Sequence, residues 1–278
     1  MILLSLILVH FIGDFYFQTN KMVLQKAKYL TQHVFTHFLL SFFVLVLLYM
    51  TTGVLTSFFI QVAGSALFIA FFHYLIDKGK IYLTVKLPEG QNLWPLALFL
   101  CDQLLHIGAI LLTGFLFFPS AFDPLVTMDF SWTERMLILA ILFILVTTVS
   151  GHIIRLLLGV LPNHLSLYEG KYIIKNSYPV QQPPDKLFSE EFTYMVAKKQ
   201  DLSRGLYIGY VERLLVIVLI VHNAYSSIAF IIAAKSLARF KQMDDRDFAE
   251  YFLLGTLSSI FLGIIYGIIV RLILFQPV

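Results

Sequence analysis

Long apolar stretches separated by short polar connectors dominate this chain of 278 residues. A helix needs roughly 20 apolar residues to cross the hydrocarbon core of a bilayer. The pattern has room for six or seven such helices and predicts an all-α, polytopic helical membrane protein. The clearest predicted spans are Ile2–Phe17, His33–Met50, Val54–Asp77, Trp94–Phe118, Arg135–Leu161 and Tyr251–Leu274.

One long polar stretch, residues 162–204, follows the fifth predicted span. It contains Pro179, Pro183, Pro184 and scattered charges of both signs. It is too short for an independent domain and too long for a turn, so we interpret it as an ordered cytoplasmic cap or docking loop. The chain then divides into a five-helix membrane bundle (1–161), this loop (162–204) and C-terminal membrane helices with a charged connector (205–278).

The apolar stretch from Glu212 to Ile232 is ambiguous, because His222 and Asn223 interrupt it. If it crosses the membrane once, the chain has seven spans. It is alternatively a hairpin that enters at Glu212 and returns by Lys235. The hydrophobic pattern leaves both interpretations open.

Basic residues in the short connectors predict the orientation, because cytoplasmic loops of membrane proteins are enriched in Lys and Arg. The connector after the first span is basic, and so is the one after the third, whereas the turn at residues 51–53 and the loop after the fourth span are not. We therefore expect the N-terminus to face outward and the Lys-bearing loops to face the cytoplasm. The connector from Lys235 to Arg246 breaks this pattern if the stretch before it crosses fully.

Composition agrees with a membrane protein: 59% of residues are hydrophobic, 13% are charged and the mean hydropathy is +0.82. The net charge of +3 comes without a basic stripe that carries interleaved aromatic residues. The expected partner is therefore the lipid bilayer and not nucleic acid. A single cysteine, Cys101, excludes an internal disulfide and a cysteine-rich zinc site. The oligomeric state is left open.

Four pairs of potential metal ligands stand four residues apart in the first four predicted spans. Residues i and i+4 lie on the same face of a helix, so both members of a pair can aim at one point. With the orientation above, all four pairs fall in the cytoplasmic half of the membrane, which favours a shared site. The pairs are His10 and Asp14, His33 and His37, His73 and Asp77, and Asp102 and His106.

Imidazole and carboxylate groups inside hydrocarbon need a partner or a function, and a mixed set of the two suits zinc, manganese or iron. Eight ligands exceed what one tetrahedral zinc uses, so we expect one or two divalent ions, zinc first. Asp77 or Asp102 is then a candidate catalytic base, and His152 a candidate extra ligand. The competing interpretation is that these groups only hydrogen-bond neighbouring helices.

Residues beside the pairs are expected to support them. Gly13 would allow two helices to approach closely, and Gly79 would end the third span. Gln18 and Gln103 would donate hydrogen bonds to the ligands.

Three sequence blocks, HFIGDFYFQT at 10–19, HYLID at 73–77 and DQLLH at 102–106, resemble the bacterial membrane family called domain of unknown function 3307. The tail is similar to the same family in GYVERLL from Gly209, AKSLARF from Ala234 and RDFAEYFLLGTLSS from Arg246. The resemblance implies a soluble cytoplasmic partner, SatD-like, because family genes neighbour SatD-type genes. It assigns no role to the charged residues of the tail.

The chain is more distantly similar to membrane-bound metal-dependent hydrolases, and through them to zinc phospholipase C and single-strand nucleases that use HxxxD pairs on helices. The pairs that begin at His10 and His73 match this pattern. Those that begin at His33 and Asp102 do not.

These features favour a metal-dependent hydrolase that acts at the inner face on a phosphoester of a lipid or lipid-linked molecule. No GxSxG elbow, Cys/His pair or phosphate-binding glycine loop suggests other chemistry. One alternative is a metal-ion transporter, although the outer halves of spans two to four are nearly all apolar. Another is a sensor or scaffold with a structural metal and a cytoplasmic partner. Candidate substrate contacts are Glu212, Arg213, Lys235 and Arg239.

Overall fold

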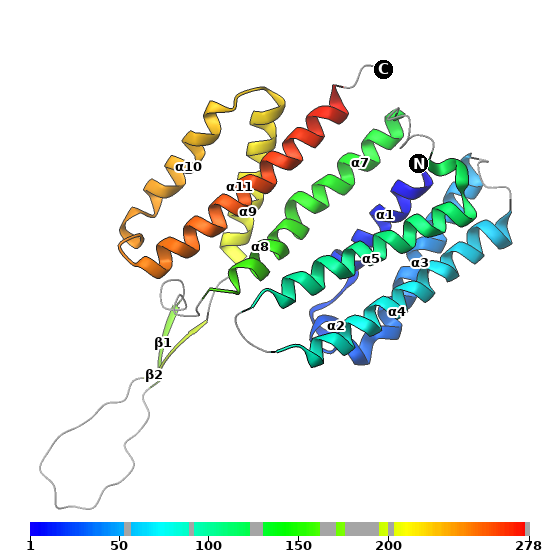
Figure 1. Cartoon of the computed structure of the whole chain (residues 1–278), viewed down its shortest axis with the longest axis horizontal. Helices are drawn as coiled ribbons and strands as arrows, with labels where there is room; N and C mark the ends of the chain where they lie inside the picture. The colour runs from blue at the N-terminus through cyan, green and yellow to red at the C-terminus, as the bar shows by residue number, and fades with distance from the viewer. Residues whose placement is uncertain are drawn as a thin grey trace, which may run out of the picture.

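The computed structural model is a bundle of helices with both chain ends at one end of the bundle (Figure 1). It describes residues 1–52, 57–88, 92–122, 130–161, 171–175, 195–199 and 203–275. The α-helices are α1 (Ile2–Ile12), α2 (Asn20–Leu24), α3 (Lys26–Thr52), α4 (Ser65–Lys86), α5 (Trp94–Phe117), α7 (Trp132–Ile144), α8 (Ser150–Leu158), α9 (Ser203–Val221), α10 (Ser226–Ala238) and α11 (Arg246–Leu274). Three π-helical segments, η1 (Gly13–Phe17), η2 (Phe58–Gly64) and η4 (Leu145–Val149), continue α1, precede α4 and join α7 to α8; η3 (Pro119–Phe122) and η6 (Phe240–Gln242) are 3₁₀-helices.

Five helical segments among the described residues are long and apolar enough to cross a membrane. Large apolar side chains cover their outer faces; Phe59, for example, is 83% exposed. Such an extended apolar surface is unfavourable in water and is stable against lipid tails. The prediction of an all-α polytopic membrane protein is therefore confirmed. The five segments are Lys26–Thr51, Phe58–Lys86, Trp94–Phe117, Trp132–Leu158 and Arg246–Leu274, with shorter apolar helices at Ile2–Phe17 and Ser226–Ala238.

Three boundaries of the predicted spans differ from the structure by more than one helical turn. Helix α3 begins at Lys26, seven residues before the predicted start of the second span, and α11 begins at Arg246, five residues before the predicted start of the last. The end of the third span differs as well. Gly79 was expected to end this span, whereas α4 continues for two further turns to Lys86. Lys78 is exposed and Lys80 half-buried, so their long side chains can reach water or a partner without breaking the helix. The expected start of this span, Val54, lies outside the described residues.

Helix starts in the second half of the chain follow from side-chain caps. The Ser131 hydroxyl accepts from the Glu134 amide, and Glu134 accepts in return from the Ser131 amide, which forms a capping box at the start of α7. Asp245 accepts from the Phe248 amide at 2.8 Å and caps α11. The fifth predicted span is therefore α7, η4 and α8 in one continuous rod.

The tail forms the hairpin that the sequence left as one of two possibilities. Helices α9 and α10 are joined at residues 222–225, where Asn223 has a φ of 59°, a conformation that Asn tolerates. The Lys235 ammonium lies 2.7 Å from the Glu212 carboxylate, which ties the two antiparallel helices together. A single crossing by this stretch is therefore wrong.

The hairpin also removes the conflict in the charge pattern. Successive helical segments run alternately up and down the bundle (Figure 1). The connectors at 18–28 and 239–246 and the lysine-rich end of α4 consequently lie at one end, which we call the basic end. The turn at 222–225 and both termini of the described chain lie at the opposite end.

The described part of the predicted 162–204 loop consists of a small antiparallel sheet and the first two residues of α9. Strands β1 (Lys171–Lys175) and β2 (Met195–Lys199) pair with Lys171 opposite Lys199. They lie beyond the basic end of α8 and α9 (Figure 1). The prolines of this loop lie outside the described residues.

Three apolar clusters hold the helices together. The largest joins α1, α3, α4 and α5 through residues such as Leu3, Leu45 and Ile110. A second, around Phe11 and Phe99, joins α1 and α5 to α7 and α8. A third joins α9, α10 and α11. The first cluster lies toward the end opposite the basic end, and this leaves the other half of the same four helices for polar side chains.

Candidate metal centre

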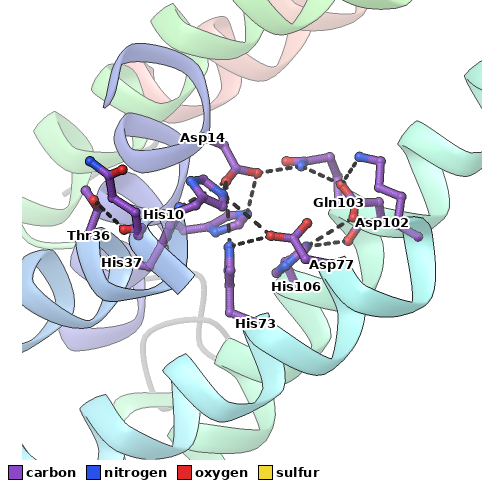
Figure 2. Close-up of polar contacts among 12 residues, drawn as sticks. His10, Asp14, Thr36, His37, His73, Asp77, Asp102, Gln103 and His106 are labelled. Carbon is purple, nitrogen blue, oxygen red and sulfur yellow. Dashed lines mark hydrogen bonds and ion pairs between the residues drawn. The ribbon is translucent and has the colours of Figure 1, made fainter. Parts of the chain in front are cut away.

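The eight predicted ligands form one cluster inside the N-terminal helices, and Figure 2 labels all of them except His33. They come from α1 with η1, α3, α4 and α5, and His73 at the centre is 1% exposed. His33 lies seven residues from the start of α3, and Asp102 eight from the start of α5. At 1.5 Å per residue, both lie about 10–12 Å from the basic end of their helices. The expected convergence at one depth is therefore observed.

One group of potential ligand atoms surrounds the Asp14 carboxylate. Its Oδ1 lies 3.0 Å from His37 Nε2, 3.2 Å from His33 Nε2 and 4.0 Å from His73 Nε2. Each of the four residues offers an atom within 4.8 Å of the others, which makes the group able to hold an ion.

A second group consists of His73, Asp77 and His106 and has the same compactness. Asp77 Oδ2 lies 3.3 Å from His73 Nε2 and 3.6 Å from His33 Nε2. The two groups share His73, whose Nε2 has one lone pair and can ligate one ion at a time. If His73 ligates the ion of the second group, two ions divide the six residues into two sets of three, which is the ligand number of catalytic zinc sites.

The atoms that face the centre of the cluster have few well-directed hydrogen bonds. Asp14 Oδ1 and Nε2 of His37 and His73 are buried and make ion-pair contacts with neighbouring ligands in place of such bonds. His106 Nε2 is buried without a hydrogen-bond partner among the described residues. Buried polar atoms in native proteins are nearly always hydrogen-bonded, and a cation at this point would satisfy these lone pairs together.

Hydrogen bonds on the far side of the ligands orient them for this role. His106 Nδ1 lies 2.8 Å from the backbone carbonyl of Asp102, to which it donates; Nε2 is then the nitrogen with the free lone pair. Gln103 Nε2 donates to Asp14 Oδ2 at 2.8 Å and to Asp102 Oδ2 at 3.3 Å, as expected of a residue that supports the ligands.

Residues 2–131 match the model of a family described as protein of unknown function (DUF3307). Over that range the chain is similar to this family. The range contains α1 to α5 and hence all eight residues of the cluster, so the cluster lies entirely in the matched part of the chain. No curated protein and no solved structure was found to match.

Two of the eight predicted ligands, Asp102 and His10, belong to neither of the two groups that could hold an ion, which we call the ion-holding groups. Both lie beside them. Asp102 accepts a hydrogen bond from the Lys80 ammonium at 2.6 Å. His10 stacks on His106 with ring centroids 5.0 Å apart, and its Nε2 is 3.7 Å from Asp14 Oδ2. Their roles as ligands, and that of Asp102 as a base, stay predictions.

Gly13 explains how η1 and α3 approach so closely. A Cβ at this position would overlap the His37 imidazole. The expectation that Gly13 permits close helix approach is therefore confirmed. The π-helical turn of η1 also carries Asp14, and π-turns of this kind are frequent at functional sites.

The remaining predicted site residues lie away from the two groups. The His152 ring on α8 packs on Phe99 at 4.6 Å between centroids. Arg213 is buried among helices and donates to the protein's own carbonyls. The candidate contacts on α9 and α10 include the Glu212–Lys235 pair, and Arg239 lies over the Phe248 ring.

A small pocket connects the cluster to the basic end, with room for roughly one water molecule. Sequence reasoning missed Lys26, which lines this pocket, and Lys80, which pairs with Asp102. Both were counted only as loop charges that set the orientation. Their positions one or two helical turns from a ligand could have indicated more. The pocket is lined by Gln18, Met22, Lys26, Tyr29, Leu30, His33, Asp77 and Ile81.

Proposed function

We propose that this protein is an integral membrane hydrolase that depends on one or two divalent metal ions. Zinc is the first candidate, with manganese and iron as the others. The substrate is a phosphoester of a lipid or lipid-linked molecule, reached from the cytoplasmic face of the bacterial inner membrane. The observation that carries the proposal is the compact, buried set of imidazole nitrogens and carboxylate oxygens around His73, which could hold a metal ion.

The residues of the cluster suit hydrolysis. A divalent ion held by them would act as a Lewis acid and make bound water more acidic. Asp77 belongs to one ion-holding group and also lines the pocket. It is therefore the carboxylate best situated to take a proton from an attacking water. Gln103 holds the Asp14 carboxylate in place from the other side.

One-sided access supports an enzyme over a transporter. The pocket is lined by residues of the segment 18–30 near the basic end, whereas the other half of the same helices is filled by an apolar core. Leu45 and Val62 in that core are fully buried. A transport path needs polar groups or a break in packing through the full depth of the membrane, and the apolar core opposes both.

A metal-stabilised scaffold with a cytoplasmic partner is the second candidate. The small pocket favours it, because structural metal sites are closed and catalytic ones keep an open position. The β1–β2 sheet at the basic end offers a surface for such a partner. Deletion of residues 162–202 would abolish function in this case and leave the metal content unchanged.

Elemental analysis of the purified full chain tests the proposal, together with hydrolysis assays on phospholipids in nanodiscs. We expect one or two ions per chain in the wild type, and loss of both metal and activity in His73→Ala. The matched control is His152→Ala, a membrane-embedded histidine outside both groups, which should keep both. Wild-type protein without transition metal would overturn the proposal, and metal-loaded protein without hydrolysis of any phosphoester would favour the scaffold.

A further inference from the structure

Lys26 lines the pocket that reaches two residues of the cluster, His33 and Asp77. It stands seven residues before His33 on α3, a spacing that places both on one helix face. Lys26, His33 and Asp77 line the same pocket. Lys26 is half-buried and forms no hydrogen bond or salt bridge with any described residue. An ammonium group in such a place needs an anionic partner.

Ion binding would change which partner Lys26 has. The charges of Asp14, Asp77 and Asp102 act on Lys26, and so does that of Lys80. With neutral imidazoles, three carboxylates and two ammonium groups carry one net negative charge. A single divalent ion makes this one net positive charge, and two ions make it three. The site with metal is therefore complementary to an anion, and the site without metal is not.

The lining of the pocket indicates what kind of anion would fit. Tyr29 and Gln18 offer neutral hydrogen-bond donors beside Lys26. Met22, Leu30 and Ile81 contribute apolar walls. An amphipathic molecule with an anionic headgroup matches these polar and apolar lining residues better than a fully hydrophilic metabolite does.

We propose that the pocket binds a phosphate monoester group of an amphipathic substrate, with Lys26 as its ammonium contact. The dianionic charge of a phosphate monoester matches the positive charge of the site with metal, and lysine is a common phosphate ligand. This inference rests on the proposed metal-dependent function and names its substrate class. Because the pocket has room for roughly one water, it must widen when the substrate enters.

Calorimetry with inorganic phosphate as the probe tests the inference on the full chain, purified in detergent and loaded with zinc. Lys26→Gln should weaken phosphate binding about 10- to 100-fold, the usual effect of losing a hydrogen bond to a charged group. Lys26→Arg should retain most of it. The control is Lys28→Gln, because Lys28 is exposed and lies over the neighbouring Tyr29 ring at 5.5 Å. Zinc content, measured in parallel, shows that each variant keeps the metal site.

A second arm distinguishes the sources of the phosphate group. Nanodiscs with phosphatidic acid should compete with inorganic phosphate if the substrate is a lipid, and nanodiscs of phosphatidylcholine alone should not. Competition only by soluble glycerol phosphate would support a phosphate monoester that is not a membrane lipid.

Three results would overturn the inference. These are unchanged phosphate binding in Lys26→Gln, equal losses in Lys26→Gln and Lys28→Gln, and equal binding by zinc-loaded and zinc-free protein. If Lys26→Gln hydrolyses a phosphoester with unchanged KM, the inference fails and the proposed function stands. If the wild-type chain holds no metal, the proposed function itself fails.

Discussion

The imidazole of His37 occupies the space that a side chain at position 13 would fill. This ring stacks on His73 with centroids 3.9 Å apart and lies against the Asp14 carboxylate. Three potential ligands from three helices therefore depend on the absence of one methyl group. Gly13 therefore supports the site by leaving space for the His37 ring.

Gly13→Ala should displace His37 and lower the zinc content of the purified protein by at least about tenfold, a typical effect of disturbing the support of a ligand. Gly79→Ala is the control, because no atom lies within 4 Å of a Cβ at that position. Gly79 lies inside α4, so alanine there should raise stability by roughly 0.5–1 kcal/mol. Elemental analysis and thermal unfolding of the two variants measure both effects. Full zinc content in Gly13→Ala would show that His37 is not a ligand.

Single residues were predictable where the signal was local. The i, i+4 spacing of the four pairs is a property of the helix alone, so it identified eight side chains that meet. The pairing of Lys80 with Asp102 was not predictable, because it depends on how α4 and α5 rotate against each other. The same holds for the separation of Asp102 and His10 from the two ion-holding groups.

Among the elements, η4 depends on a residue far away in sequence. A π-helical turn leaves backbone carbonyls without their usual partners. Arg213 on α9 donates from Nε to the Val146 carbonyl at 2.6 Å and from a terminal nitrogen to the Thr147 carbonyl at 3.2 Å. Its other terminal nitrogen donates to Ser259 Oγ on α11 at 3.1 Å. One buried guanidinium thereby joins the rod of α7, η4 and α8 to α9 and α11.

Arg213→Met should destabilise the protein by about 1–3 kcal/mol, because buried carbonyls lose their donors. Its zinc content should stay that of the wild type. Arg246→Met is the comparison. The Arg246 side chain is 89% exposed, and its one ion pair among the described residues is with Glu250, one helical turn further along α11; exposed pairs contribute little. Thermal unfolding measures the difference. A raised KM with unchanged stability would instead support the predicted role of Arg213 in substrate binding.

At the scale of the whole molecule, charge is distributed along the bundle axis. The basic connectors share one end, and the cluster lies nearer to it than the apolar core around Leu45 does. The hairpin of α9 and α10 makes this possible, because it returns the chain to the basic end before α11 begins. Orientation in the membrane and access to the site are thus two consequences of the same topology.

Cysteine labelling in intact bacterial cells tests this topology. Exposed positions at the two ends are His222 and Lys241. In a Cys101→Ser background, His222→Cys should react with a membrane-impermeant maleimide from outside, and Lys241→Cys only after the cells are opened. Labelling of both positions from the same side would contradict the hairpin, and the reverse pattern would place the metal centre near the outer face.

The sequence by itself determined the class of protein, most helix boundaries and the side chains that share a helix face. These follow from hydrophobicity and helical periodicity, which act over a few residues. Tertiary structure alone decided that the tail folds back as a hairpin, that His73 belongs to both groups of potential ligands, and that Lys26 lines the pocket beside them. Those features depend on the rotation and depth of each helix against its neighbours, and that packing is set by side chains far apart in the chain.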